Sequence, residues 1–115
     1  MAMRIYFSGI GGVGIGPLAQ IAIDAGYDVI GSDMAESPQT HMLSERGATV
    51  YIGQTGNDIK QAHNEKHIDW FVYTAFLTDG LKELEFAKAH NIRCSKRDEL
   101  LAEIIKEKDL SLIAV

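Results

Sequence analysis

The sequence predicts an α/β fold, a Rossmann-like doubly wound parallel sheet with helices on both faces. Three observations predict this fold: short β-prone runs alternate with segments of helical periodicity, a glycine-rich turn lies between the first strand and the first helix, and 115 residues suit one domain. Strands that alternate with helices form βαβ units, whose right-handed crossovers require a parallel sheet covered on both sides. We therefore expect residues 1–115 to form a single domain.

The first three elements are the best defined. Residues 4–8 form a short apolar run that ends in glycines, which predicts a strand. Residues 14–26 carry apolar side chains at helical spacing, which predicts a helix. Pro17 falls in its first turn, where a missing N–H costs little, and Gly26 is placed to end it. Residues 28–31 then predict a second strand.

The same alternation continues to the end of the chain. Apolar residues three and four apart predict the later helices, and runs rich in β-branched and aromatic residues predict the later strands. These elements are helices at 38–46, 57–63, 81–90 and 97–106, and strands at 48–52, 70–73, 92–95 and 110–115. The last run is apolar up to the chain end, whereas domains normally end in polar segments, so we expect an N-terminal piece of a longer protein.

Charge and composition exclude several classes of partner. The formal net charge is −5, which argues against nucleic acid or an anionic membrane as the main partner. A phosphate ligand is still possible, because backbone N–H groups bind phosphate without lysine. One cysteine permits no internal disulfide, and no apolar run approaches the roughly 18 residues that span a membrane. A cytoplasmic protein is the simplest interpretation.

The glycine loop is the main functional signal. Gly9, Gly11 and Gly14 satisfy the G-x-G-x-x-G pattern between a predicted strand and a predicted helix, which is the context that gives the motif meaning. In such a loop the first glycine permits a tight turn, the second lets backbone approach a phosphate, and the third lets the helix pack close to the sheet. The helix N-terminus then offers N–H groups to an anion. The alternative is a turn without a ligand, which would need fewer glycines.

A second part of the site is expected where the second strand ends. Ligands of open parallel sheets bind beyond the carboxyl ends of the strands, and Gly31-Ser32-Asp33 lies there. Asp33 is placed to accept hydrogen bonds from a ribose or a base N–H. The alternative is that Ser32 or Asp33 caps the following helix. Thr74, at the end of the fourth strand, offers a hydroxyl to a phosphate or sugar, or simply ends the strand.

Other reactive residue types form no recognisable catalytic pattern. His63 and His67 have the spacing of metal ligands on one helix face, but no third ligand is near in sequence, so we predict no metal site. Cys94 lies in an apolar strand and is expected to be a small core residue. The sequence shows no Ser-His-Asp or Cys-His arrangement, so no catalytic residue is assigned.

Taken together, these stretches resemble the N-terminal domain of the Mur ligases of peptidoglycan synthesis, and within that family the ligases that join L-alanine to UDP-N-acetylmuramate. The resemblance covers the whole chain, in the stretches 10–14, 31–33, 43–52, 73–75 and 97–103. It implies that the chain is the UDP-sugar-binding third of a three-domain enzyme. In that enzyme ATP and Mg²⁺ would activate the muramyl carboxylate as an acyl phosphate, which L-alanine would then attack.

The resemblance also implies roles for individual residues. Backbone N–H groups of the glycine loop would hold the diphosphate, Ser32 and Asp33 would lie near the uridine, and Thr74 would lie near the phosphates or the sugar. The implied UDP-sugar-binding residues are Gly9, Gly11, Gly12, Val13, Gly14, Ser32, Asp33 and Thr74. Two departures are present: Gln54 stands where the family often has histidine, and Tyr73-Thr74 stands where it often has two serines.

The implied partners are UDP-N-acetylmuramate and the central ATPase domain of the same parent chain, with no nucleic acid and no membrane. The loop lacks the Gly-Lys-Ser/Thr of an ATP-binding loop, so the chain alone is expected to hold no cofactor and to be inactive. The rival hypothesis is a NAD-binding regulatory module of the kind attached to potassium channels, which would use the same loop for a pyrophosphate and Asp33 for a ribose. A truncated dehydrogenase is a third, less favoured hypothesis.

Overall fold

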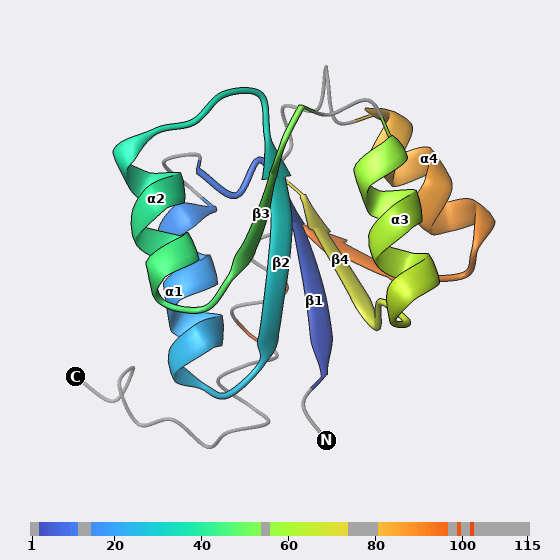
Figure 1. The fold of residues 1–115 in the computed structure, drawn as a ribbon. Coiled ribbons are helices and arrows are strands. Elements are labelled where there is room, and N and C mark those ends of the chain that lie inside the picture. Colours follow the sequence, from blue (N-terminus) through green and yellow to red (C-terminus); the bar gives the residue numbers. More distant parts are fainter. Residues whose placement is uncertain are drawn as a thin grey trace.

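The computed structural model describes residues 3–11, 15–53, 56–73 and 81–96, together with residues 99 and 102. Strands and helices alternate through these ranges (Figure 1). The strands are β1 (Arg4–Ser8), β2 (Asp28–Asp33), β3 (Thr49–Ile52), β4 (Trp70–Tyr73) and β5 (Arg93–Lys96). The helices are α1 (Gly16–Asp24), α2 (Pro38–Glu45), α3 (Asn57–Glu65) and α4 (Leu81–Ala89).

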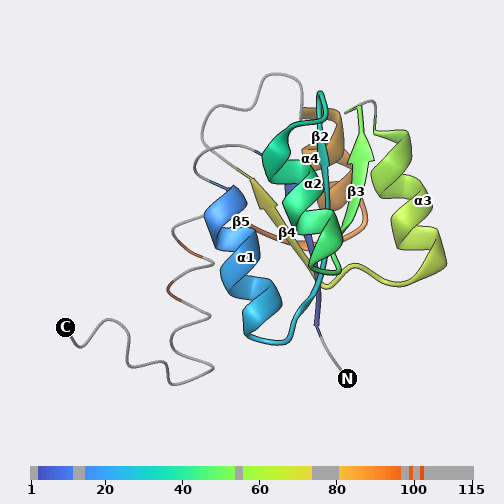
Figure 2. The same cartoon turned by 60° about the vertical axis from the view of Figure 1, so that its left-hand side comes forward.

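All strand pairs of the sheet are parallel, in the order β3-β2-β1-β4-β5. Helices α1 and α2 cover one face, and α3 and α4 cover the other, as Figures 1 and 2 both show. This arrangement confirms the predicted doubly wound α/β fold. The chain moves outward from β1 to β3 and then returns to the other side of β1, so the switch point of the sheet lies between β1 and β4, where ligands of such sheets bind.

Each face of the sheet has its own apolar core. Side chains alternate along a strand, so Ile5 and Phe7 of β1 join the core under α1 and α2, whereas Tyr6 joins the core under α3 and α4. Every residue of β1 is buried. A central strand with both faces covered explains why this segment reads as a nearly continuous apolar run.

The predicted boundaries hold with small corrections. Strand β2 runs to Asp33 instead of residue 31, because Ser32 and Asp33 still pair with β3. Helix α3 continues two residues beyond 63, α1 begins at Gly16, and β5 lies one residue later than predicted. Pro17 does lie in the first turn of α1. Except for residues 99 and 102, the predicted elements at 97–106 and 110–115 lie outside the described residues.

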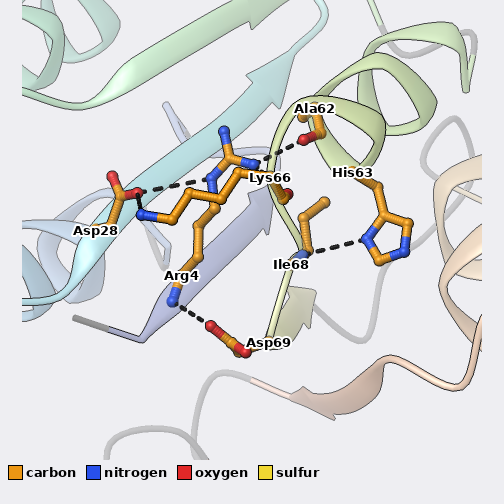
Figure 3. A network of polar contacts seen from close by, with 7 residues as sticks. All are labelled: Arg4, Asp28, Ala62, His63, Lys66, Ile68 and Asp69. Atoms are coloured by element: carbon orange, nitrogen blue, oxygen red, sulfur yellow. Dashed lines mark hydrogen bonds and ion pairs between the residues drawn. The ribbon is translucent and has the colours of Figure 1, made fainter. Parts of the chain in front are cut away.

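A polar network ties β1 to the end of α3 at the amino edge of the sheet (Figure 3). The buried Arg4 guanidinium donates to the carbonyl oxygen of Ala62 at 2.6 Å and also to that of Lys66. These carbonyls belong to the last turn of the helix and its C-cap, and the carbonyl of Ala62 also accepts the backbone N–H of Lys66 at 3.1 Å. Arg4 also lies 3.6 Å from Asp28, and its backbone N–H donates to Asp69 at 2.8 Å. The network therefore fixes α3 against the sheet at the edge opposite to the glycine loop.

Candidate functional site

The glycine loop leaves β1 at the carboxyl edge of the sheet, which is uppermost in Figure 1. Gly9 has φ +77°, in the left-handed region, and no atom lies within 4 Å of the place of its absent Cβ. Backbone conformation therefore requires glycine here, as the predicted tight turn does. The N–H groups of Gly9 and Ile10 both donate to the carbonyl oxygen of Ser32, each at 2.8 Å. The loop thus begins by folding over the end of β2.

Gly11 lies directly against Asp33. Its N–H donates to Asp33 Oδ2 at 2.8 Å. A Cβ at position 11 would lie 2.7 Å from that oxygen and 2.7 Å from Cγ2 of Thr40, closer than real contacts allow. The sequence suggested that glycine is needed here to admit a phosphate; in the structure, the chain's own side chains fill the space beside it. The amide of Gly11 therefore already holds an anionic oxygen.

The start of α2 is capped by Ser37. Its Oγ accepts the N–H of Thr40 at 3.2 Å, and Oγ1 of Thr40 accepts the N–H of Ser37 at 2.8 Å, which forms a capping box. The alternative that Ser32 or Asp33 caps this helix is therefore wrong. Asp33 stays half-buried beside the loop, with Oδ1 at 3.5 Å from the N–H of Ala35.

Ser32 turns its side chain to the opposite face of the sheet from Asp33, because neighbouring residues in a strand alternate. The Ser32 side chain is fully buried, and its Oγ donates to Oε1 of Glu83 at 2.7 Å. The structure therefore brings the backbone of Ser32, but not its hydroxyl, to the side of the sheet where Gly11 and Asp33 meet. The predicted role of Ser32 near a uridine stays a prediction.

Glu83 is a residue of this region that the sequence interpretation missed. It is fully buried in the first turn of α4 and accepts hydrogen bonds from Tyr6 at 2.5 Å and Ser8 at 2.8 Å, besides the one from β2. Burial raises the pKa of its carboxyl, and the hydroxyl donors partly offset that rise. A signal was present: polar Tyr6 and Ser8 alternate with apolar Ile5 and Phe7 in a strand buried on both faces, and buried hydroxyls need partners.

Several of the predicted site residues lie outside the described residues. These are Gly12, Val13, Gly14 and Thr74, and the departure at Gln54 also falls there. Their predicted contacts with a UDP-sugar stay predictions. The structure brings together three remaining parts of the site, which are the turn at Gly9, the amide of Gly11 and the side-chain carboxylate of Asp33.

His63, His67 and His90 lie at or beyond the C-terminal ends of α3 and α4, away from this edge. His63 accepts the N–H of Ile68 at 3.1 Å, and its ring lies 5.0 Å from His67 and 5.6 Å from His90 between centroids. Partial burial, then the two neighbouring rings, lower the pKa of His63. Across the described ranges, no three His, Cys, Asp or Glu side chains come together as ligands for a metal ion. Cys94 is half-buried, at the margin of the core under α3 and α4.

Within the described residues, no helix has both the length and the apolarity that crossing a bilayer requires.

Comparison with known proteins identifies related sequences over nearly the whole chain. Residues 4–109 match the family described as "Mur ligase family, catalytic domain". A UDP-N-acetylmuramate–L-alanine ligase of Clostridium novyi is 39% identical over 103 residues, which cover 90% of this chain and 21% of that protein. The enzyme of the same name from Aquifex aeolicus is 36% identical over 106 residues, covering 92% of this chain and 22% of that protein.

Solved structures give the same relationship. A UDP-N-acetylmuramate:L-alanyl-γ-D-glutamyl-meso-diaminopimelate ligase from Neisseria meningitidis superposes with a TM-score of 0.76 at 27% sequence identity. The superposition covers 90% of this chain and 31% of the Neisseria chain. The chain thus spans about a fifth of the length of the curated relatives it matches.

Proposed function

This chain belongs to the Mur ligase family, and on that premise we propose that it binds the UDP part of UDP-N-acetylmuramate for an ATP-dependent ligase. The parent ligase adds L-alanine in the synthesis of peptidoglycan precursors, in the cytoplasm. Two observations support this proposal: the matched relatives are named UDP-N-acetylmuramate–L-alanine ligases, and this chain spans about a fifth of their length.

One contact carries the proposal. At the carboxyl edge, next to the switch point of the sheet, the N–H of Gly11 donates to a carboxylate oxygen of Asp33. The loop backbone is therefore shaped to receive an anionic oxygen, which is also what a diphosphate presents. When a diphosphate binds, one of its oxygens accepts the hydrogen bond from the N–H of Gly11 in place of Asp33. The Asp33 carboxylate is then available to the nucleoside. Gly12, Val13 and Gly14 supply further N–H groups in this proposal, and Thr74 contacts the phosphates or the sugar.

The glycine loop lacks a group that the parent reaction requires. Phosphoryl transfer from ATP needs a phosphate-binding lysine and magnesium ligands. The loop here continues as Gly14-Ile15-Gly16, without the lysine of an ATP-binding loop. ATP and Mg²⁺ therefore belong to the central domain of the parent, and the chain alone releases no phosphate from ATP in the presence of UDP-N-acetylmuramate and L-alanine.

Calorimetric titration of the purified chain tests the proposal. We expect heat of binding with UDP and UDP-N-acetylmuramate and a weaker response to NADH. The variant Asp33→Ala should lower the affinity for UDP. Its affinity for inorganic pyrophosphate should be unchanged or higher, because removal of the carboxylate also frees the amide of Gly11. Asp24→Ala, at the exposed end of α1, is the matched control. Tight NADH binding without a response to UDP would instead support the rival NAD-binding module.

A further inference from the structure

The proposed nucleotide site assigns no role to one buried acid, Glu83. Glu83 is fully buried, yet it projects from α4 toward the sheet and receives hydrogen bonds from Tyr6, Ser8 and Ser32. Buried carboxyls are costly unless hydrogen-bonded, and three hydroxyl donors from two strands are an unusually complete set of partners. A purely apolar contact between helix and sheet would need none of them, so the cluster calls for an explanation.

The cluster lies directly behind the two backbone segments that build the nucleotide site. Ser8 and Ser32 face each other in the register of β1 and β2. Ser8 is followed by Gly9, and Ser32 is followed by Asp33. The carbonyl of Ser32 receives the first N–H groups of the loop. The Glu83 carboxyl therefore holds the last residue before the glycine turn and the last residue before the site aspartate.

Burial disfavours the ionised form of Glu83 and raises the pKa of its carboxyl, and the hydroxyl donors of the cluster partly offset that rise. From β1, Glu83 faces Tyr6, whose pKa is raised by burial and by Glu83 itself. The negative charge of Asp58, in α3, raises the pKa of Glu83 further, and the hydroxyl of Ser32, in β2, lowers it. The N-terminus of α4 acts in the opposite direction, because its partial positive charge favours an anion. A diphosphate bound on the glycine loop would add negative charge near Glu83, and this charge would further disfavour the ionised form of its carboxyl.

We propose that Glu83 is a positioning residue for the nucleotide site, and that a diphosphate bound on the glycine loop is accompanied by uptake of one proton at the Glu83 carboxyl. The proton comes from the solvent and forms an O–H bond on one carboxyl oxygen, which then donates to a hydroxyl oxygen of the cluster while that hydroxyl rotates. The inference rests on the proposed function, because it needs an anionic ligand at Gly11.

The test uses UDP-N-acetylglucosamine, whose diphosphate diester keeps a constant charge in the weakly acidic to neutral range. Titrations in two buffers of different ionisation enthalpy should show proton uptake by the wild-type chain and none by Glu83→Gln. Affinity for the wild type should fall as the pH rises, and this dependence should disappear in Glu83→Gln. The amide oxygen of that variant still accepts from Ser8 and Ser32, so its affinity at acid pH should stay within about threefold.

Two further variants separate positioning from charge. Glu83→Ala removes the acceptor for both serines and should weaken binding at least about tenfold at every pH. Glu85→Gln, at an exposed position of the same helix, should leave affinity and proton uptake unchanged. Circular dichroism melts check that each variant is folded. If Glu83→Ala does not fold, the comparison of proton uptake and pH dependence between the wild type and Glu83→Gln alone tests the proposal.

A readout without ligand is available as well. In NMR spectra of the free wild type, the amide signals of Gly9, Gly11 and Ser32 should titrate together above the usual range of a glutamate, and they should not do so in Glu83→Gln. If the wild type binds UDP-sugars but takes up no proton, and both Glu83 variants bind as it does, this inference is overturned while the proposed function stands. If the wild type binds no UDP compound, both fall.

Discussion

Replacing Gly11 by alanine tests the close contact between the glycine loop and α2. The new Cβ would lie 2.7 Å from Asp33 Oδ2 and 2.7 Å from Thr40 Cγ2. Overpacking of this kind costs about 1–3 kcal/mol, and a weakened hydrogen bond to a charged oxygen costs about 1.5–3 kcal/mol when it is lost. Since both neighbours can shift in part, we expect unfolding free energy to fall by about 2–4 kcal/mol, which lowers Tm by roughly 8–16 °C.

A double-mutant cycle shows whether the cost comes from that contact. Thr40→Ser removes Cγ2 but keeps the hydroxyl that caps α2. In this background Gly11→Ala should cost at least about 1 kcal/mol less in urea unfolding with an unchanged m-value. Gly47→Ala is the matched control, because φ +112° strains alanine there while no atom lies within 4 Å of its Cβ, so its cost should add to that of Thr40→Ser. Strict additivity for Gly11→Ala would refute the reasoning.

Two further predictions concern the rest of the molecule. Arg4→Met should lower unfolding free energy by about 2–4 kcal/mol in urea titrations, because it removes the buried guanidinium donor from the carbonyls of Ala62 and Lys66 at the end of α3. Lys66→Ala, which breaks only an exposed ion pair, should cost less than about 1 kcal/mol, and equal losses would contradict this difference. His63 has a pKa below its ordinary value of 6.5, so the folded state favours the neutral ring. Its contribution to stability is complete above that ordinary pKa and is lost as the pH falls below it. The urea midpoint should therefore fall less steeply on acidification in His63→Asn than in the wild type or in the exposed control His41→Asn, and parallel curves for all three would rule this out.

The fold was predictable because local signals and global architecture agree. Alternation of β-prone runs with helical spacing predicted the parallel sheet, and the most β-prone run, at residues 70–73, coincides with β4. The end of β2 was not predictable from its own residues, because Ser32 and Asp33 are poor strand formers. They extend the strand because neighbouring strands pair with them: Ser8 of β1 lies opposite Ser32, and residues 51 and 52 of β3 lie opposite Ser32 and Asp33.

The candidate site was predictable where one segment carries the whole pattern, as at the glycine turn. It was not predictable where segments far apart in sequence meet. Gly11 meets Asp33 across 22 positions, and Tyr6 meets Glu83 across 77. Ser32 illustrates the reason: its neighbour Asp33 lies beside the loop, but the alternation of side chains turns the Ser32 hydroxyl to the other face of the sheet.

The central place of β1 has a consequence for synthesis on the ribosome. Among the strands of this sheet β1 is synthesised first, yet one of its two partner strands, β4, follows more than sixty residues later. The backbone N–H of Arg4 likewise has no Asp69 to donate to until 65 further residues have been added. At about 5–20 residues per second, translation leaves this edge of β1 open for roughly 3–13 s. During that interval β1, α1 and β2 can form, but an apolar strand edge stays exposed to other nascent chains. Slow elongation before residue 70 should therefore favour aggregation, and a chaperone that shields β1 would bind in that window.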